Sequence, residues 1–167
     1  GPYAARAGQD RNCLALAGLG SALVPREGEP VVPAVQLGDV AGGLAAVIAI
    51  LAALHERART GEGRHLDVSL TEACHSFAIL RNAELMAADV VARPGEDVLF
   101  GGSPAYRYYR CADGRWLAVA SIEPKFRERL CRVLGRPDLA EDLFMPGERA
   151  AELHAELEAL FATRTRD

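Results

Sequence analysis

The chain has 167 residues, half of them hydrophobic and a quarter charged, which is typical of one ordinary globular domain or two small ones rather than of a disordered chain. Its formal net charge of -4, with lysines and arginines spread along the sequence, excludes the basic surface of a typical nucleic-acid-binding protein. The four cysteines and four histidines form no zinc-finger spacing, so we expect free thiols in a reducing cytoplasm and no metal site.

The first half of the chain predicts a helix-rich region. Residues 11–24 are mostly apolar and contain two glycines, which indicates a short buried helix or turn. Three prolines and two glycines between Pro25 and Asp39 predict a loop. From Val40 to Arg59 the pattern is helical. Its uncharged part, Val40 to Leu54, is fifteen residues long, short of the roughly 20 that span a bilayer. We therefore expect a buried helix and no membrane contact.

A strand and a second helix are predicted next. Residues 64–70 alternate between apolar and polar side chains, as a half-buried strand does, and residues 71–88 have a helical pattern. A helix, a strand and a helix in this order make half of an α/β layer, so we predict an α/β fold with a parallel sheet. One strand cannot form a sheet, so the remaining strands must come either from outside this chain or from a part of it whose pattern gives no assignment. Residues 1–88 are assigned to this first domain.

The last part of the chain predicts a small α+β domain over residues 105–167, after a linker over residues 89–104. Two runs rich in aromatic and β-branched residues flank the turn at Ala112–Gly114, which predicts a β-hairpin. Pro124 predicts the start of a helix that ends before Gly135. Apolar residues at helical spacing predict a final helix over about residues 146–163.

Asp39 stands alone at the start of the uncharged helix and is the first candidate for chemistry. Its simplest role is that of an N-cap, because aspartate readily accepts a backbone N–H of the first turn. The alternative is a catalytic carboxylate, since a helix N-terminus favours the ionised form that a nucleophile or base requires. Gly42 and Gly43 follow one turn later. Each costs a helix up to about 1 kcal/mol relative to alanine, which indicates either close approach of a ligand or helix packing.

Four blocks occur in order along the chain: "GPYAARAGQDRNCLALAG", "PAVQLGDVAGG", "GEGRHLDVSLTEA" and "GGSPAYRYYRCADGRWLAVASIEPKF". Together they resemble the family III CoA-transferases of the CaiB/BaiF type, which include formyl-CoA-type transferases and α-methylacyl-CoA racemases. The resemblance implies part of a Rossmann-like large domain, a smaller domain that comes from the middle of the family's full-length chain, and an interlocked homodimer. It also implies an internal segment of a longer enzyme, so we expect these residues alone to be inactive.

The resemblance further implies that Asp39 is the catalytic aspartate of the family. In the transferases this group attacks the acyl-CoA thioester, expels CoA and carries the acyl group as a mixed anhydride, which the acceptor carboxylate or the returning CoA then opens. In the racemases it is one of two bases flanking the α-carbon, and the second is a histidine where this chain has Gln9. A glutamine amide transfers no proton but can donate a hydrogen bond to a thioester oxygen, so Gln9 favours acyl transfer.

Three more site residues are implied by the resemblance. Glu123 matches a racemase glutamate near the catalytic histidine, Tyr106 matches a position lining the substrate pocket, and Asp10 falls in the block that contacts CoA. The plain alternatives are an acid before a helix start for Glu123 and a packed hairpin aromatic for Tyr106. We predict an acyl-CoA:carboxylate CoA-transferase with a CoA thioester as substrate, a small carboxylic acid as acceptor and no bound cofactor. The alternatives are an α-methylacyl-CoA racemase-like isomerase and a non-catalytic CoA-binding relative.

Overall fold

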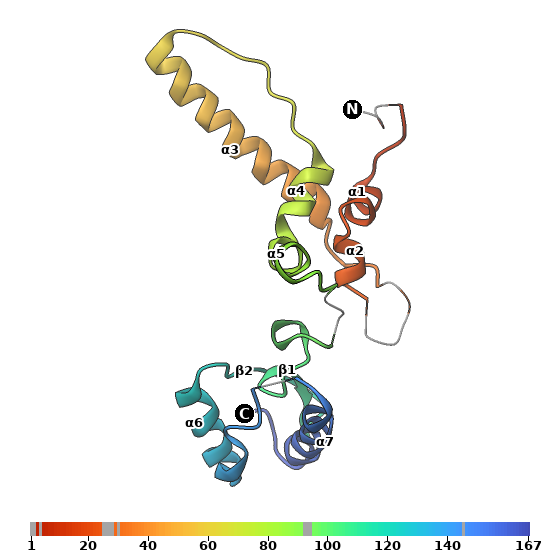
Figure 1. Cartoon of the computed structure of the whole chain (residues 1–167), viewed down its shortest axis with the longest axis vertical. Coiled ribbons are helices and arrows are strands. Elements are labelled where there is room, and N and C mark those ends of the chain that lie inside the picture. Colours follow the sequence, from red (N-terminus) through yellow and green to blue (C-terminus); the bar gives the residue numbers. More distant parts are fainter. Residues whose placement is uncertain (1–2, 4, 25–28, 30, 92–94, 145) are drawn as a thin grey trace. The chain divides into compact units, whose positions relative to one another are not determined.

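The computed structural model of the chain describes residues 3, 5–24, 29, 31–91, 95–144 and 146–167. The chain folds as two compact units, Gly1–Val91 and Ala92–Asp167 (Figure 1). The division falls inside segment 89–104, which the sequence assigns to a linker, and residues 92–94 of that segment lie outside the described residues.

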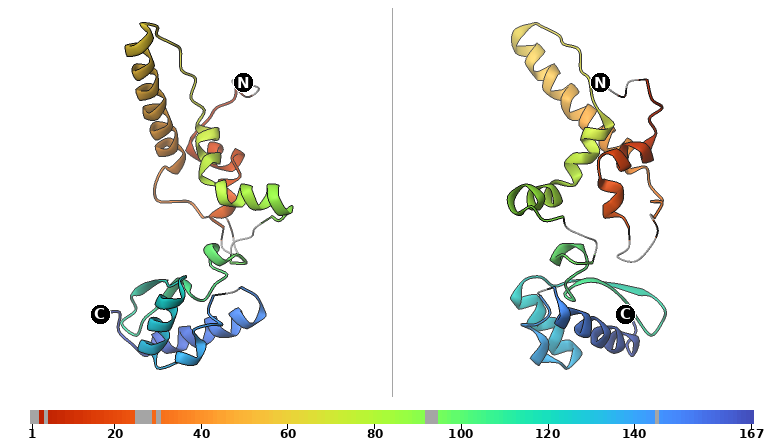
Figure 2. Two further views of the ribbon diagram at one scale, coloured as in Figure 1. Left: turned by 60° about the vertical axis from the view of Figure 1, so that its left-hand side comes forward. Right: turned by 45° about the vertical axis from the view of Figure 1, so that its right-hand side comes forward.

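The first unit is helical throughout its regular structure. Its described residues form α1 (Asp10–Leu16), α2 (Leu19–Ala22), α3 (Leu37–Thr60), α4 (Leu70–Phe77) and α5 (Ile79–Ala88). In Figures 1 and 2, α1 and α4 lie against the N-terminal end of α3, and the rest of α3 extends beyond them. A small core fills the region where these three helices meet, and its buried members are Cys13, Leu14, Ala17, Ala41, Ala73 and Cys74. Helix α3 is therefore packed at its N-terminal end.

Most of α3 is exposed, which corrects the expectation of a buried helix. Only Gly38, Ala41 and Gly42 are buried in this helix of the described chain. Its exposed aliphatic side chains are Val40, Leu44, Val47, Ile48, Ile50, Leu51 and Leu54. Helix α3 has 24 residues and contains an 18-residue stretch with a mean hydropathy of 2.2, so it is long and apolar enough to cross a bilayer, a test that the core helix of a soluble protein also passes. The helix ends as predicted at Gly61, whose φ is 78°.

Two secondary-structure predictions for the first unit are wrong. Residues 64–69 form no strand, and Leu70 already belongs to α4. Within the described part of this unit there is no second strand to complete a hydrogen-bonded ladder, so an alternating pattern alone does not produce one. The single helix predicted over residues 71–88 is broken at Ala78 into α4 and α5. The side-chain amide of Asn82 donates to the carbonyl of His75 (3.4 Å) and partners a backbone group at this break.

The loop predicted between Pro25 and Asp39 is too long at its C-terminal end. Helix α3 begins at Leu37, two residues before Asp39 and three before the predicted start. Residues 25–28 and 30 of this loop lie outside the described residues.

The second unit contains the predicted β-hairpin. Strand β1 (Tyr106–Arg110) pairs antiparallel with β2 (Trp116–Ala120), and Gly114 in the connecting turn has a φ of 76°. This is the one sheet among the described residues, so the parallel sheet expected from the sequence is not found there. The fold of the described chain is a helix-dominated mixture of α and β structure.

The helices predicted for the second unit are confirmed. Helix α6 (Pro124–Leu134) begins at its proline and ends at Gly135, and α7 (Glu148–Ala162) falls within the predicted final helix. Two short 3₁₀ turns, η1 (Val98–Phe100) and η2 (Pro137–Leu139), complete the regular structure described for this unit.

Tyr109 lies at the centre of the second core. Its side chain is fully buried, its ring stacks on Phe161 with centroids 4.9 Å apart, and its hydroxyl donates to the carbonyl of Pro104 at 2.7 Å. Helix α7 packs against β1 and contributes Leu153 and Leu157, both fully buried. The hairpin and the two helices therefore share one apolar core.

Candidate functional site

Asp39 is exposed in the first turn of α3. The N-cap of the helix is Gln36, so the expectation that Asp39 itself caps α3 is wrong. Within the described part of the chain the Asp39 carboxylate accepts no hydrogen bond, while its backbone N–H is engaged. The side chain is therefore free to meet a ligand from solvent.

The cap of α3 is supplied by a different helix. One carboxylate oxygen of Asp10, the first residue of α1, accepts the backbone N–H groups of Gly38 (2.6 Å) and Asp39 (3.1 Å). These belong to the first-turn donors that a helix cannot satisfy internally. Asp10, for which the resemblance implies CoA binding, thus contacts the backbone of the predicted nucleophile directly.

Gln9 lies next to this contact. It is exposed and forms the N-cap of α1, and its backbone N–H donates to the side-chain oxygen of Asn12 at 3.2 Å. Because Asp10 follows Gln9 directly, the predicted hydrogen-bond donor and the predicted nucleophile lie at two helix N-termini joined by one carboxylate. The structure brings Asp10 into contact with the backbone of Asp39, and Gln9 is the neighbour of Asp10 in sequence.

The two glycines of α3 have different surroundings. A Cβ on Gly42 would lie 2.7 Å from Cγ of Leu70, so Gly42 allows α3 to pack closely on α4. A Cβ on Gly43 would meet nothing within 4 Å, and this residue is exposed. Helix packing therefore explains Gly42, whereas Gly43 leaves open space on the surface of α3.

A large open hollow of about 850 Å³ lies in the first unit. Its lining includes Gly8 and Asn12 on one side, and Ser69 and Glu72 at the start of α4 on the other. Arg6, whose guanidinium lies 4.8 Å from the centroid of the Tyr3 ring, brings a positive charge to this hollow. Asp67 and Glu72 also line the hollow, so its lining has no excess of positive charge, and the predicted site residues Gln9, Asp10 and Asp39 are not part of it.

The buried thiols of Cys13 and Cys74 belong to the core where α1, α3 and α4 meet. Cys74 is fully buried, and burial raises the pKa of its thiol, with Cys13, Asp10 and Asp39 adding to the effect. A thiol whose pKa is raised stays protonated near neutral pH, so Cys74 fills space and does not act as a nucleophile. All four cysteines of the chain are free and buried, which confirms the expectation of free thiols.

Tyr106 and Glu123 belong to the second unit, unlike the other predicted site residues. Tyr106 is half-buried at the start of β1 and pairs with Ala120. Glu123 is exposed as the N-cap residue of α6, where its backbone carbonyl accepts the N–H groups of Phe126 (2.9 Å) and Arg127 (3.1 Å). Its carboxylate does not cap the helix and stays exposed. The ordinary structural roles weighed for these two residues are compatible with these positions.

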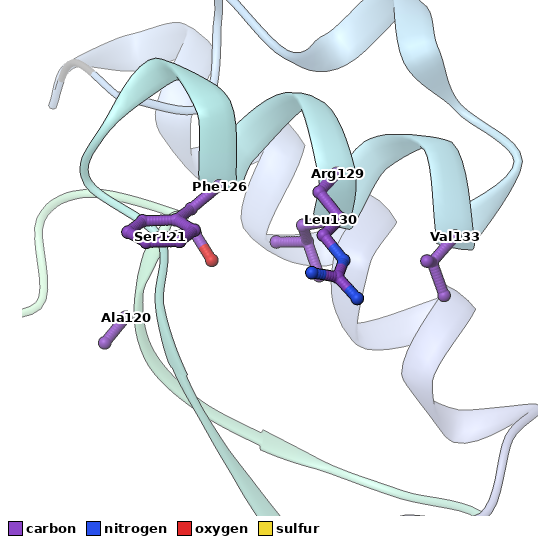
Figure 3. Close-up of a pocket in the computed structure, with 6 residues that line it drawn as sticks. All are labelled: Ala120, Ser121, Phe126, Arg129, Leu130 and Val133. Carbon is purple, nitrogen blue, oxygen red and sulfur yellow. The ribbon is translucent and has the colours of Figure 1, made fainter.

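A shallow hollow of about 380 Å³ lies between the end of β2 and α6 (Figure 3). Its lining is mostly apolar, and its polar groups are the hydroxyl of Ser121 and the guanidinium of Arg129. Glu123 does not line it, so this hollow is not explained by the residues predicted from the sequence.

Gly38 has a role that the sequence did not predict. A Cβ at this position would lie 3.0 Å from both the backbone oxygen and a carboxylate oxygen of Asp10, and 3.3 Å from Sγ of Cys74. Glycine is therefore needed where α1 approaches the first turn of α3. The sequence did contain a signal, a glycine directly before the candidate aspartate, but this glycine was interpreted only as evidence for a loop.

Comparison with known proteins places this arrangement in a family. The sequence model of CoA-transferase family III matches residues 1–167. Alpha-methylacyl-CoA racemase of Homo sapiens is 39% identical over 138 residues, which are 81% of this chain and 36% of the racemase. The succinyl-CoA–L-malate CoA-transferase beta subunit of Chloroflexus aurantiacus is 31% identical over 157 residues, 93% of this chain and 38% of that subunit.

A solved structure shares the fold over the whole chain. The crystal structure of a CAIB/BAIF family protein from Brucella suis superposes with a TM-score of 0.78 at 29% identity, covering 100% of this chain and 45% of that one. The chain thus spans less than half the length of the relatives it matches. Since the family model covers every residue, the chain belongs to CoA-transferase family III.

Proposed function

We propose that this chain carries the nucleophile of an acyl-CoA:carboxylate CoA-transferase, and that Asp39 is that nucleophile. The observation that supports this most directly is the exposed carboxylate of Asp39 in the first turn of α3, with its backbone fixed by Asp10 and with Gln9 one residue from Asp10. A reactive carboxylate needs open access on one side and a fixed backbone on the other.

In the proposed reaction a carboxylate oxygen of Asp39 attacks the carbonyl carbon of the acyl-CoA. The carbon–sulfur bond breaks, CoA leaves as the thiolate, and the acyl group remains on Asp39 as a mixed anhydride. The acceptor carboxylate attacks the acyl carbon and releases Asp39, and the CoA thiolate then attacks the acceptor carbonyl. The products are the acceptor's CoA thioester and the free donor acid. The side-chain amide of Gln9 donates a hydrogen bond to the oxyanion that forms during the first attack.

A racemase-like isomerase is the second candidate, because a human alpha-methylacyl-CoA racemase is among the relatives at 39% identity. Racemisation needs a base on one face of the α-carbon and an acid on the other. Gln9 provides neither, which is why we favour the transferase.

The transferase proposal is tested by trapping the anhydride. The protein that contains this chain is incubated with acyl-CoA and then with hydroxylamine or borohydride, and its peptides are mapped by mass spectrometry. We expect the modification on Asp39 and no modification in an Asp39→Asn variant. Transfer activity without a modification on Asp39 would contradict the proposal. Acyl-CoA binding without turnover would instead favour the non-catalytic alternative.

Hydrogen exchange at the substrate separates the two enzymatic candidates. Racemisation of a 2-methylacyl-CoA in D₂O places deuterium on the α-carbon, whereas transfer through an anhydride leaves that carbon untouched. We expect CoA transfer without deuterium uptake. Deuterium uptake that disappears in Asp39→Asn would favour the racemase-like alternative.

We further propose a homodimer whose large domain is Rossmann-like and includes the first unit. The exposed aliphatic side chains of α3 support this, because soluble proteins rarely leave a contiguous apolar surface of this kind uncovered. Light scattering on the protein that contains this chain should give twice the monomer mass. The four free thiols are compatible with the cytoplasm, which we propose as its location.

A further inference from the structure

The contact between α1 and α3 links two segments that are distant in sequence. Asp10 and Gly38 are 28 residues apart, and the Asp10 carboxylate accepts two successive N–H groups of α3 with one oxygen. A carboxylate at a helix N-terminus makes charge-assisted hydrogen bonds and also interacts favourably with the helix dipole. Asp10 itself lies in the first turn of α1, so its charge lies at the N-terminal ends of two helices.

Steric fit restricts this contact further. Gly38 has almost no free space, because Asp10 on one side and the Cys74 sulfur on the other occupy the volume that a side chain would need. Cys74 and the backbone of Gly38 are both buried, and Asp10 is half-buried. The first turn of α3 is therefore held between α1 and α4 at the residue that directly precedes Asp39.

We propose that Asp10 is a positioning residue for Asp39, acting through the two backbone hydrogen bonds and not through contact with CoA. The proposal rests on the function proposed above, with Asp39 as the reacting group. Without an acceptor at residue 10, the first turn of α3 loses its cap, and Gly38 gives that turn freedom to fray. The Asp39 carboxylate then moves relative to Gln9 and the bound thioester. A displacement of about 1 Å at a reacting group costs about 100-fold in rate.

The inference differs from the CoA-binding role implied by the family resemblance, and kinetics separate the two. A positioning residue acts on kcat, whereas a residue that binds CoA acts on KM. For Asp10→Ala in the protein that contains this chain, we expect kcat to fall by about 10- to 100-fold with KM for acyl-CoA changed less than about threefold. Asparagine caps helices about as well as aspartate, so Asp10→Asn should keep kcat within about threefold of the wild type. Thr60→Ala is the matched control, since the Thr60 hydroxyl bonds to Glu56 and Glu62 at the opposite end of α3.

The hydrogen bonds themselves are measured by amide hydrogen exchange of the same variants. The N–H groups of Gly38 and Asp39 should be protected in the wild type and in Asp10→Asn, and should lose protection in Asp10→Ala and not in Thr60→Ala. This readout does not depend on activity and also shows that each variant is folded. A raised KM at unchanged kcat in Asp10→Ala would overturn the proposal. Protection of both N–H groups in Asp10→Ala would overturn it as well, and so would an Asp10→Asn variant as slow as Asp10→Ala.

The proposed function is checked separately with Asp39→Ala. Full activity in that variant removes Asp39 as the reacting group and contradicts the proposed function, whatever the Asp10 variants do. If Asp39→Ala is inactive, a loss of kcat in Asp10→Ala tests the positioning role alone, for transfer or for racemisation alike.

Discussion

The neighbouring glycines of α3 give a stability prediction with opposite signs at adjacent positions. Replacing a glycine in a helix interior by alanine stabilises the helix by about 1 kcal/mol when the new methyl group has room. Gly43 has that room, since no atom beyond the adjacent backbone of its own helix lies within 4 Å of its Cβ position. We therefore expect Gly43→Ala to raise the free energy of unfolding by about 1 kcal/mol.

Gly42→Ala should behave differently because its methyl group meets Leu70. The added Cβ would lie 2.7 Å from Cγ and 3.0 Å from Cδ1 of that side chain. Carbon atoms in good contact lie about 3.5–4.0 Å apart, so Leu70 must move by about 1 Å. Overpacking of this kind costs about 1–3 kcal/mol, which offsets the helix gain of about 1 kcal/mol. We expect Gly42→Ala to change stability by between about 0 and 2 kcal/mol in the destabilising direction.

Urea unfolding followed by circular dichroism measures both variants. The single tryptophan, Trp116, lies in β2 of the second unit, so its fluorescence reports that unit and should be unchanged by either substitution. Leu70→Ala provides the decisive background, because it removes the side chain that the new methyl group meets. In that background Gly42→Ala should become stabilising by about 1 kcal/mol, like Gly43→Ala. Equal effects of the two glycine substitutions in the wild-type background would refute close packing of α3 on α4 at Gly42.

Three further predictions concern the two cores. Tyr109→Phe leaves the carbonyl of Pro104 without its buried donor and should lower the stability of the second unit by about 1–3 kcal/mol, measured by Trp116 fluorescence; an unchanged midpoint would contradict the hydrogen bond. Leu157→Ala creates a cavity at a fully buried position and should cost about 2–5 kcal/mol in the same assay, so a loss below about 1 kcal/mol would count against that core. The pKa of the Cys74 thiol is raised above its ordinary value of 9.0, so its contribution to stability is complete below that pH and is lost as pH rises through the raised pKa. The urea midpoint of the wild type should therefore fall more between about pH 8 and pH 10 than that of Cys74→Ala. Parallel pH profiles of the two proteins would refute this.

Local signals predicted the second unit well. The hairpin depends on a turn of three consecutive residues with Gly114 at a positive φ, and α6 depends on Pro124 and Gly135 at its two ends. Each of these signals acts within a few residues of the element it controls, so the sequence alone contains the necessary information.

The first unit was harder to predict because its determinants act between distant segments. The start of α3 depends on a carboxylate 28 residues earlier in the chain, and no pattern around Asp39 reveals it. The helix over residues 71–88 breaks at Ala78, where Asn82 and His75 form their own contacts. The alternating segment 64–70 has the composition of a strand but no described partner strand, and pairing is a property of two segments.

The candidate site stays a prediction, and the structure shows where its residues lie. Sequence and resemblance together indicate Asp39, Gln9 and Asp10; in the structure Asp10 contacts the backbone of Asp39, and Gln9 precedes Asp10 as the N-cap of α1. The role of Gly38 did not follow from its neighbours in sequence, because the atoms that crowd this position belong to Asp10 and Cys74, which are distant along the chain.

The bare aliphatic surface of α3 has a practical consequence for anyone who produces these 167 residues by themselves. A helix that presents Ile48 and Leu51 to water at 68% and 61% exposure offers a ready binding surface for hydrophobic dyes and detergents. We expect such a preparation to brighten a dye such as anilinonaphthalene sulfonate and to lose solubility as it is concentrated. Charged substitutions along the middle of α3 should improve the yield without disturbing the packed N-terminal end of the helix.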